Sequence, residues 1–394
     1  MKKAMKHLPT IIFLVFIYTM AILFFVLPKS DYSSSEKRYL EKFPKLTADT
    51  FFSGDFGADF ETYLADHTAG RKFYVGLNSY YHLGLGNPVS NGIYHCKNGY
   101  LVNDPPVTDQ FDRNVKIVSE FASLNNVETS FLLAPSTGYI TNDILPNKHI
   151  HYNDDALFAN AAAKFKDAGV NFIDVRDTFK NEYKAGKQIY YKTDHHWTTE
   201  GAFTAYKSLA ATLGFKSFDK SDYTIKTENN FYGTTYSSSG FWCAEPDTIE
   251  MWSNKENHKI NVTIKDRNKD NQKITINNDS VFFTERLKED DKYPVFLDGN
   301  HPYTVINNES LKEKENDKKL LVIKDSFAHS LVPFLSDHYS QIIMIDLRYY
   351  RQNINEGTLS VADLIKTNNI DQVLFIYSLD NFATDAENLI HTIM

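Results

Sequence analysis

The stretch Leu320-Leu321-Val322-Ile323-Lys324-Asp325-Ser326-Phe327 indicates most about the fold. Its first four residues are apolar, and a short apolar run of this kind is typical of a strand buried on both faces. A helix is expected at residues 329–334, so Ser326 lies where a strand passes into a helix. In open α/β folds this junction exposes side chains at the carboxyl edge of the sheet, where ligands bind.

Segments on both sides of this stretch repeat the alternation of strand and helix. One apolar run stops at Pro135, as a buried strand would, and one amphipathic segment closes at Gly169, as a helix would. We expect strands at residues 130–134, 170–175, 342–345 and 373–377, and helices at residues 115–122, 156–168, 200–213 and 361–366. This alternation predicts an α/β fold, with a parallel sheet flanked by helices.

Residues 215–318 interrupt the alternation. They are rich in Asn, Lys, Asp and Thr, and residues 259–264 and 273–276 alternate between polar and apolar. The pattern predicts a β-rich, loop-heavy insertion in the α/β domain. Sequons at Asn261, Asn278 and Asn308 are short patterns that chance alone produces in an Asn-rich segment.

The N-terminus predicts a membrane anchor. Three lysines precede residues 8–27, an almost wholly apolar and uncharged run of about 20 residues, which is enough to span a bilayer. The lysines place the N-terminus in the cytoplasm. A cleaved signal peptide is the alternative, but its apolar core is usually only about 7–15 residues and ends in a small-residue site, which the run 26–30 lacks.

The expected organisation is therefore a cytoplasmic tail and transmembrane helix at residues 1–28, a polar stalk at 29–50 and one catalytic domain at 51–394. This arrangement predicts a single-pass protein of the cytoplasmic membrane whose C-terminal domain lies outside the cytoplasm. Lys and Arg total 42 against 50 Asp and Glu, a net charge of −8, and no basic stripe is visible. Nucleic acid is therefore not an expected partner.

Only two cysteines are present, Cys96 and Cys243. An oxidising compartment permits a disulfide between them, and two separate buried thiols are an equal alternative. They are too few and too far apart for a zinc site built on paired cysteines, so we expect no metal. The chain also has 29 Phe and 24 Tyr residues, and such rings either stack on sugars or fill the core.

The segment Tyr191-Lys192-Thr193-Asp194-His195-His196-Trp197-Thr198 carries the strongest chemical signal. If the segment is extended, Asp194 and His196 point to the same side and His195 points to the other. A serine that attacks an ester needs a base to take its proton and an acid to orient that base, and these two residues with Ser326 supply all three groups. The alternatives are an Asp–His pair that merely fastens a loop, or a metal site, for which no third or fourth ligand is found nearby.

Stabilisers of a negatively charged intermediate are harder to identify. Gly299 and Asn300 follow a short apolar run and offer a backbone N–H and a side-chain amide, although Asp-Gly-Asn is also typical turn sequence. Arg348 follows another expected strand at the same edge of the sheet. It either holds an anionic or hydroxyl-rich ligand or pairs with a carboxylate, and pairing is the commoner role of an isolated arginine.

These motifs resemble a known family. Asp194-His195-His196-Trp197 is the motif that gives the bacterial DHHW proteins their name, and these are similar to alginate O-acetyltransferase proteins of the AlgX and AlgJ type within the SGNH-hydrolase-like group. Residues 36–44, 66–71 and 99–101 resemble further blocks of the group, and Lys324 to Phe327 resembles its serine block. The Asp and His precede the Ser along the chain, which is the permuted motif order of these relatives.

The resemblance implies roles for three residues. Ser326 is the nucleophile, His196 the general base and Asp194 the acid that orients it. Acetyl then moves to hydroxyls of an exported or cell-surface polysaccharide, no cofactor is needed, and a membrane-bound O-acyltransferase supplies the acetyl. Many relatives have Gly where this chain has Lys324, and the lysine that some carry after the proline of block Pro135-Ser136-Thr137 is missing. A carbohydrate acetylesterase and a non-catalytic glycan-binding scaffold are the alternatives.

Overall fold

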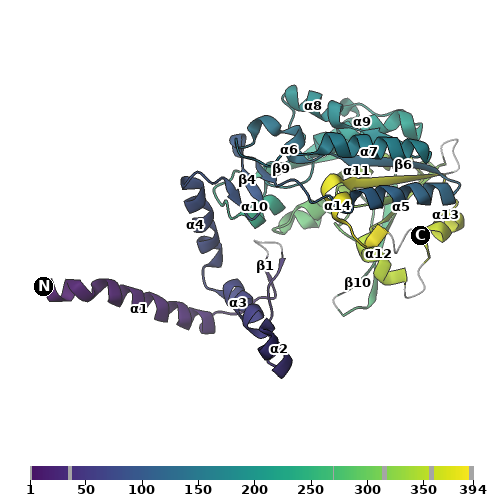
Figure 1. Cartoon of the computed structure of the whole chain (residues 1–394). Helices are drawn as coiled ribbons and strands as arrows, with labels where there is room; N and C mark the ends of the chain where they lie inside the picture. The colour runs from purple at the N-terminus through teal and green to yellow at the C-terminus, as the bar shows by residue number, and fades with distance from the viewer. Residues whose placement is uncertain (1, 34–37, 269, 313–316, 355–358, 390–394) are drawn as a thin grey trace. The chain divides into compact units, whose positions relative to one another are not determined.

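The computed structural model describes residues 2–33, 38–268, 270–312, 317–354 and 359–389 (Figure 1). The chain divides into two compact units. The first unit comprises Met1–Asn91 and Tyr236–Cys243, and the second comprises Gly92–Thr235 and Ala244–Met394.

The first unit begins with the long helix α1, Lys2–Val26. Its residues His7–Val26 have a mean hydropathy of 2.5, and none of the most apolar window is buried against other parts of the chain. The helix is therefore long and apolar enough to cross a membrane. The expected stalk region contains the two-residue strands β1, Tyr32–Ser33, and β2, Arg38–Tyr39, and the start of α2, Ala48–Ser53.

Helices α3, Asp55–His67, and α4, Arg71–Gly84, complete the first unit with the short strand β3, Val89–Ser90. Helix α4 packs against the segment Tyr236–Cys243, which is remote from it in sequence. Phe73 stacks on Trp242 with ring centroids 5.7 Å apart. A Cβ on Gly76 would lie 1.9 Å from the same indole, so only glycine permits this approach.

An eight-stranded sheet forms the centre of the second unit, in the order β11-β10-β12-β14-β13-β15-β6-β7. Strands β14, β13, β15, β6 and β7 run parallel to one another, as the alternating sequence predicts. Their bounds are β6 Glu128–Ala134, β7 Asn171–Asp174, β13 Lys319–Lys324, β14 Gln341–Ile345 and β15 Gln372–Ser378.

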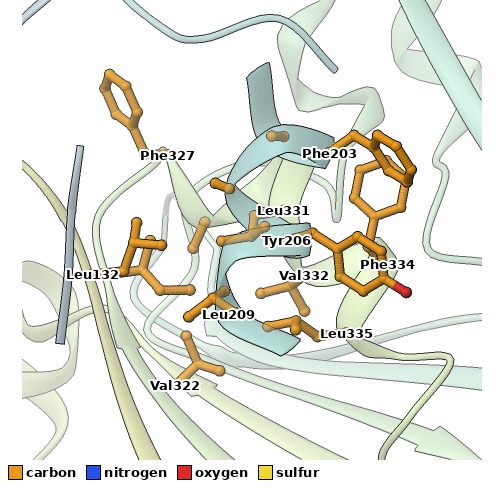
Figure 2. Close-up of a cluster of buried hydrophobic side chains, with 14 of the residues drawn as sticks. Leu132, Phe203, Tyr206, Leu209, Val322, Phe327, Leu331, Val332, Phe334 and Leu335 are labelled. Atoms are coloured by element: carbon orange, nitrogen blue, oxygen red, sulfur yellow. The ribbon is translucent and has the colours of Figure 1, made fainter. Parts of the chain in front are cut away.

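Helices cover both faces of this sheet because its central strands are apolar on both sides. Leu320 and Val322 of β13 pack on one face, and Leu321 and Ile323 pack on the other. Figure 2 shows the first cluster, in which side chains of two helices meet the sheet. The helices of this face are α8 Arg176–Lys184, α9 Thr199–Leu213 and α11 Ala328–Leu335, and those of the other are α5 Phe111–Leu124, α7 Asp154–Asp167, α13 Val361–Asn368 and α14 Leu379–Thr384.

The insertion is β-rich, as expected, and part of it extends the sheet. Strands β12, β10 and β11 join the edge strand β14 in antiparallel fashion, so the whole sheet is mixed rather than parallel throughout. Strands β10 and β11 are consecutive along the chain and pair directly, whereas β12, which pairs with β10, follows only after residues 279–302. Their bounds are β10 Ile260–Arg267, β11 Lys273–Asn278 and β12 Tyr303–Asn308.

The remaining strands form two antiparallel pairs. Strands β4, Ile93–His95, and β5, Leu101–Asn103, pair with each other, as do β8, Tyr223–Phe231, and β9, Asp247–Asn254. Three further α-helices are α6 Thr137–Ile140, α10 Thr234–Ser239 and α12 Leu347–Ile354. Cys96 and Cys243 are free thiols, but Cys243 is exposed, so the expectation of two buried thiols is correct for Cys96 only.

Candidate active site

Ser326 lies two residues beyond the end of β13, just before α11 begins at Ala328. The neighbouring strands β15 and β6 run parallel to β13, so their carboxyl ends meet the same edge of the sheet. Ser326 is only 8% exposed. The sequence-based placement of this residue at the carboxyl edge is therefore confirmed.

The Asp-His-His-Trp segment forms a tight loop closed by a bridge between Tyr190 and Trp197, and it is not extended as expected. Asp194 causes the difference, because its Oδ1 accepts a hydrogen bond from the backbone N–H of His196 at 2.9 Å, which is the contact of an Asx turn. Asp247, the first residue of β9, fixes the start of the loop. Its carboxylate accepts from the backbone N–H of Lys192 at 3.0 Å and of Thr193 at 2.8 Å.

Within this loop the two predicted partners of Ser326 meet it. His196 Nε2 lies 2.7 Å from Ser326 Oγ, across 130 residues of sequence. His196 Nδ1 lies 2.5 Å from Asp194 Oδ1. All three residues are buried, so little water competes for these contacts. A hydroxyl, an imidazole and a carboxylate connected in this order can carry a proton away from the serine.

The second oxygen of Asp194 is also held. Its Oδ2 accepts from the backbone N–H of Thr234 at 2.7 Å and from the Thr234 hydroxyl at 3.1 Å. Gly233 makes this approach possible, because a Cβ at that position would lie 2.1 Å from the Asp194 Cβ. The carboxylate therefore has one orientation, with Oδ1 toward His196.

His195 does not point away from its neighbour as expected. The rings of His195 and His196 have centroids 3.9 Å apart, because the loop turns too tightly to alternate its side chains. His195 Nδ1 bonds to Thr234 Oγ1 at 2.5 Å, and its side chain is 29% exposed. Ligand atoms of Asp194, His195 and His196 lie within 4.8 Å of one another, but both ring nitrogens of His196 already have hydrogen-bond partners.

Aromatic rings enclose the imidazole. Tyr293 stacks on His196 with ring centroids 3.9 Å apart and an interplanar angle of 12°. The Tyr293 hydroxyl donates to the carbonyl of Ser326 at 3.3 Å. Trp197 packs beside the pair, and its indole N–H donates to the carbonyl of Phe327 at 3.1 Å. These rings fix the plane of the imidazole.

Asp325 fixes the backbone on which Ser326 sits. It is fully buried, and its Oδ1 accepts from the N–H of Phe327 at 2.9 Å. Its Oδ2 accepts from the N–H and hydroxyl of Ser378 at 2.8 and 2.6 Å, and from Asn381 Nδ2 at 2.9 Å. Ser378 is the last residue of β15, so Asp325 fastens the serine turn to the neighbouring strand.

Lys324 belongs to a buried charged cluster. Its Nζ lies 3.1 Å from Asp346 Oδ2 and 2.6 Å from His329 Nε2. Burial, with Lys324 beside it, holds the pKa of His329 well below its usual value, so the ring is neutral and accepts from the amine. Burial would raise the pKa of Asp346, but Lys324 and Arg348 hold it below its usual value.

The three candidate stabilisers lie apart from the relay. Arg348 pairs with Asp346 through Nη2 at 2.6 Å and Nε at 2.8 Å, which is the commoner role anticipated for it. Asn300 Oδ1 accepts from Arg348 Nη2 at 3.3 Å, and Gly299 adopts a turn conformation with φ of +83°. Among the hydrogen bonds of the described residues, none joins Gly299, Asn300 or Arg348 to Ser326 or His196.

A wide cavity of about 1250 Å³ begins beside the loop. Lys192, two residues before Asp194, forms part of the lining of this cavity. Most of the other lining side chains are aromatic or basic. They include Tyr100, Tyr139, Tyr183, Lys180 and Lys184.

The sequence did not single out several residues that shape the site. Tyr293 lies in the insertion, where nothing distinguishes it from other tyrosines. Thr234 lies 40 positions along the chain from Asp194, whose carboxylate it holds. Asp247 lies 54 positions from Thr193, which is in the loop that it holds. Asp325 could have been identified from the sequence, because it directly precedes Ser326 in the segment that resembles the serine block of the family.

The chain is similar to one family model and to solved structures. Residues 103–246 match the family model described as an SGNH hydrolase-like domain of the acetyltransferase AlgX. Bacillus cereus PatB1, solved with a sulfonyl adduct, is 26% identical with a TM-score of 0.63, over 76% of this chain and 98% of PatB1. A DHHW family protein from Eubacterium siraeum DSM 15702 is 21% identical with a TM-score of 0.62, over 78% of this chain and 97% of that one.

No curated protein sequence matches the chain. The family model and the two solved structures confirm the SGNH hydrolase-like fold and the resemblance to the DHHW and AlgX-type proteins.

Proposed function

We propose that this protein is an extracytoplasmic O-acetyltransferase that moves acetyl groups onto hydroxyls of an exported or cell-surface polysaccharide. The observation that carries the proposal is the relay from Ser326 through His196 to Asp194, with contacts of 2.7 and 2.5 Å. The family model adds support, because its description names an acetyltransferase.

In the first half-reaction, Ser326 Oγ attacks the carbonyl carbon of an acetyl donor while His196 Nε2 takes the hydroxyl proton. Asp194 stabilises the imidazolium that forms and keeps its Nδ1 proton directed at Oδ1. His196 then returns the proton to the leaving oxygen or sulfur of the donor, and acetyl-Ser326 remains. The backbone N–H of Ser326 donates to no other described residue, and we assign it as a donor to the oxyanion.

In the second half-reaction, a sugar hydroxyl attacks acetyl-Ser326. His196 takes the sugar proton and then gives it to Ser326 Oγ as the serine leaves. The wide cavity suits the acceptor, because tyrosine rings stack on sugars and lysines donate hydrogen bonds to their oxygens. Gly299, Asn300 and Arg348 remain proposed contacts with this substrate.

The membrane arrangement follows from the same proposal. Residues 1–28 form the cytoplasmic tail and anchor, residues 29–50 a stalk, and residues 51–394 the catalytic region with its insertion at about 215–318. Acetyl donors of the cytoplasm cannot reach such a site directly. A membrane-bound O-acyltransferase that passes acetyl across the bilayer is therefore the proposed partner.

The test uses the full-length protein in detergent. Wild-type protein is incubated with a small activated acetyl ester, and acetyl-Ser326 is sought by peptide mass spectrometry. A sulfonyl fluoride should label the same serine, since PatB1 was solved with a sulfonyl adduct. Ser326→Ala should lose both modifications and keep the far-UV circular dichroism spectrum of the wild type.

Bare envelope glycan, stripped of esters by mild base, then identifies the acceptor. Acetyl appearing on the glycan supports the transferase. Release of acetate alone in the presence of glycan would identify an acetylesterase using the same relay. Failure of the wild-type protein to form acetyl-Ser326 would contradict both enzymes and favour a glycan-binding scaffold.

A further inference from the structure

A second, much smaller cavity lies at the carboxyl ends of the central strands. Its lining includes Ser136, which follows β6, and Asp380, which follows β15. Phe327, the residue after Ser326, and His195, from the loop that carries the relay, complete the side nearest the serine. The cavity therefore adjoins the candidate active site without containing the three relay side chains.

Unpartnered polar atoms gather in this cavity. Thr235 Oγ1, Ser136 Oγ and Asp104 Oδ1 are buried atoms that accept and donate no hydrogen bond within the described chain. All three residues line the cavity, and they come from three separate segments. Thr235 is 2% exposed and Ser136 is 7% exposed. Burial raises the pKa of Asp154 to about 6, although the backbone N–H of Ser136 donates to its carboxylate at 2.8 Å.

Such a concentration of unpartnered groups is unusual. Buried polar atoms in folded proteins are almost always hydrogen-bonded, since leaving one unpaired is costly. Three of them facing one cavity indicate a site that a polar group completes. Asp380 adds a fourth polar group, and burial with Asp154 nearby raises the pKa of its carboxyl to about 7.

The size of the cavity limits what can enter. Its volume is about 20 Å³, which holds roughly one water molecule or one hydroxyl group. Hydroxyls and carboxyls together can both donate to and accept from such a group. His195, whose side chain is 29% exposed, lines the cavity as well. Tyr152 lines both this cavity and the wide one, so the two cavities adjoin each other.

We propose that this small cavity binds one non-reacting hydroxyl of the acceptor sugar and thereby orients the neighbouring hydroxyl toward acetyl-Ser326. Thr235 and Ser136 are the specificity-determining residues of this subsite. The inference rests on the proposed transferase function and adds to it the group of the acceptor that is recognised. An ordered water is the competing occupant.

Thr235→Val provides a clean test because the hydroxyl it removes has no partner in the chain. Valine keeps the shape, so the urea midpoint of unfolding should stay the same or rise. The KM for base-stripped envelope glycan should rise about three- to tenfold, the value of one neutral hydrogen bond. The rate of acetyl-Ser326 formation from a small acetyl ester should not change. Ser136→Ala should behave in the same way.

Thr129→Val is the matched control. Thr129 is also 2% exposed, but it lies at the opposite end of β6, and its hydroxyl donates to the carbonyl of Val127 at 3.1 Å. Its loss should lower the urea midpoint and leave the KM for glycan unchanged. Thr235→Val should show the opposite pattern, a higher KM for glycan with an unchanged or higher urea midpoint. This difference distinguishes a binding role from a structural one.

The outcomes are distinguishable. If the wild type forms acetyl-Ser326 and acetylates glycan, but Thr235→Val and Ser136→Ala both keep the wild-type KM, the cavity holds water only and the inference is wrong. If Thr235→Val loses stability as Thr129→Val does, its hydroxyl has a structural partner and the inference is also wrong. If the wild type forms no acetyl-Ser326, the proposed function itself fails, whatever the subsite variants do.

Discussion

At the scale of single residues, each group of the relay is restrained by contacts that serve no other evident purpose. Tyr293 covers one face of the His196 ring, and Thr234 donates hydrogen bonds to Oδ2 of Asp194. A catalytic imidazole works best when its tautomer and its orientation are fixed before substrate binds. These neighbours therefore supply the preorganisation that the three relay residues alone lack.

Asp346 lies between the cations of Lys324 and Arg348. Its removal should lower the free energy of unfolding more than removal of either cation. In Asp346→Asn, Lys324 remains buried without a counter-charge and the partly exposed Arg348 loses its carboxylate, so we expect a loss of about 3–5 kcal/mol in the free energy of unfolding. In Lys324→Met, Asp346 keeps its bidentate partner Arg348, and the loss should be smaller. Urea unfolding of both variants at pH 7 measures the difference, and equal losses would contradict the central role of Asp346.

At the scale of elements, the turn between β8 and α10 decides whether Asp194 can be held. Gly233 is the critical position, since it brings the backbone against the carboxylate. In Gly233→Ala the new methyl would displace Asp194, and we expect the rate of acetyl-Ser326 formation to fall by at least tenfold. Gly57→Ala, on a helix with nothing within 4 Å of the added Cβ, should leave that rate unchanged. Equal rates for the two variants would show that Asp194 tolerates movement.

The sequence predicted which residues form the parallel strands better than it predicted which strands pair with one another. Four apolar residues were enough to identify β13, because a strand buried on both faces is typically a nearly continuous apolar run. The same reasoning could not reveal that β12 pairs with β14, since edge pairing depends on hydrogen bonds that side-chain patterns do not encode. The approach of Asp194 to His196 was predicted for the wrong local reason, an extended segment in place of a tight turn.

At the scale of the whole molecule, the buried Asp154 and the partly buried Asp380 make stability depend on pH. Burial raises the pKa of Asp380 to about 7 and that of Asp154 to about 6, both above the usual value of 3.8. The folded state therefore keeps protons that the unfolded chain releases as pH rises from about 4 to 7. The stability that these groups contribute is present below pH 4 and is lost as pH rises through this window.

Asp380→Asn tests this sign. The amide imitates the protonated acid at every pH. The difference in free energy of unfolding between variant and wild type should therefore grow in favour of the variant by on the order of 2 kcal/mol from pH 5 to pH 8. The quantity to compare is the difference in free energy of unfolding between variant and wild type, measured with urea at both pH values. A difference that is constant with pH would show that Asp380 ionises normally in the folded protein.

The place of β15 in the sheet has a consequence for biogenesis. This strand alone joins β6 and β7 on one side to β13 and the remaining strands on the other, and it is the last strand in the described sequence. Until residues 372–378 have been delivered, the sheet therefore lacks the strand that joins its two parts, and Asp325 lacks Ser378, which fastens the serine turn. We expect the proposed chemistry at Ser326 to require this last strand.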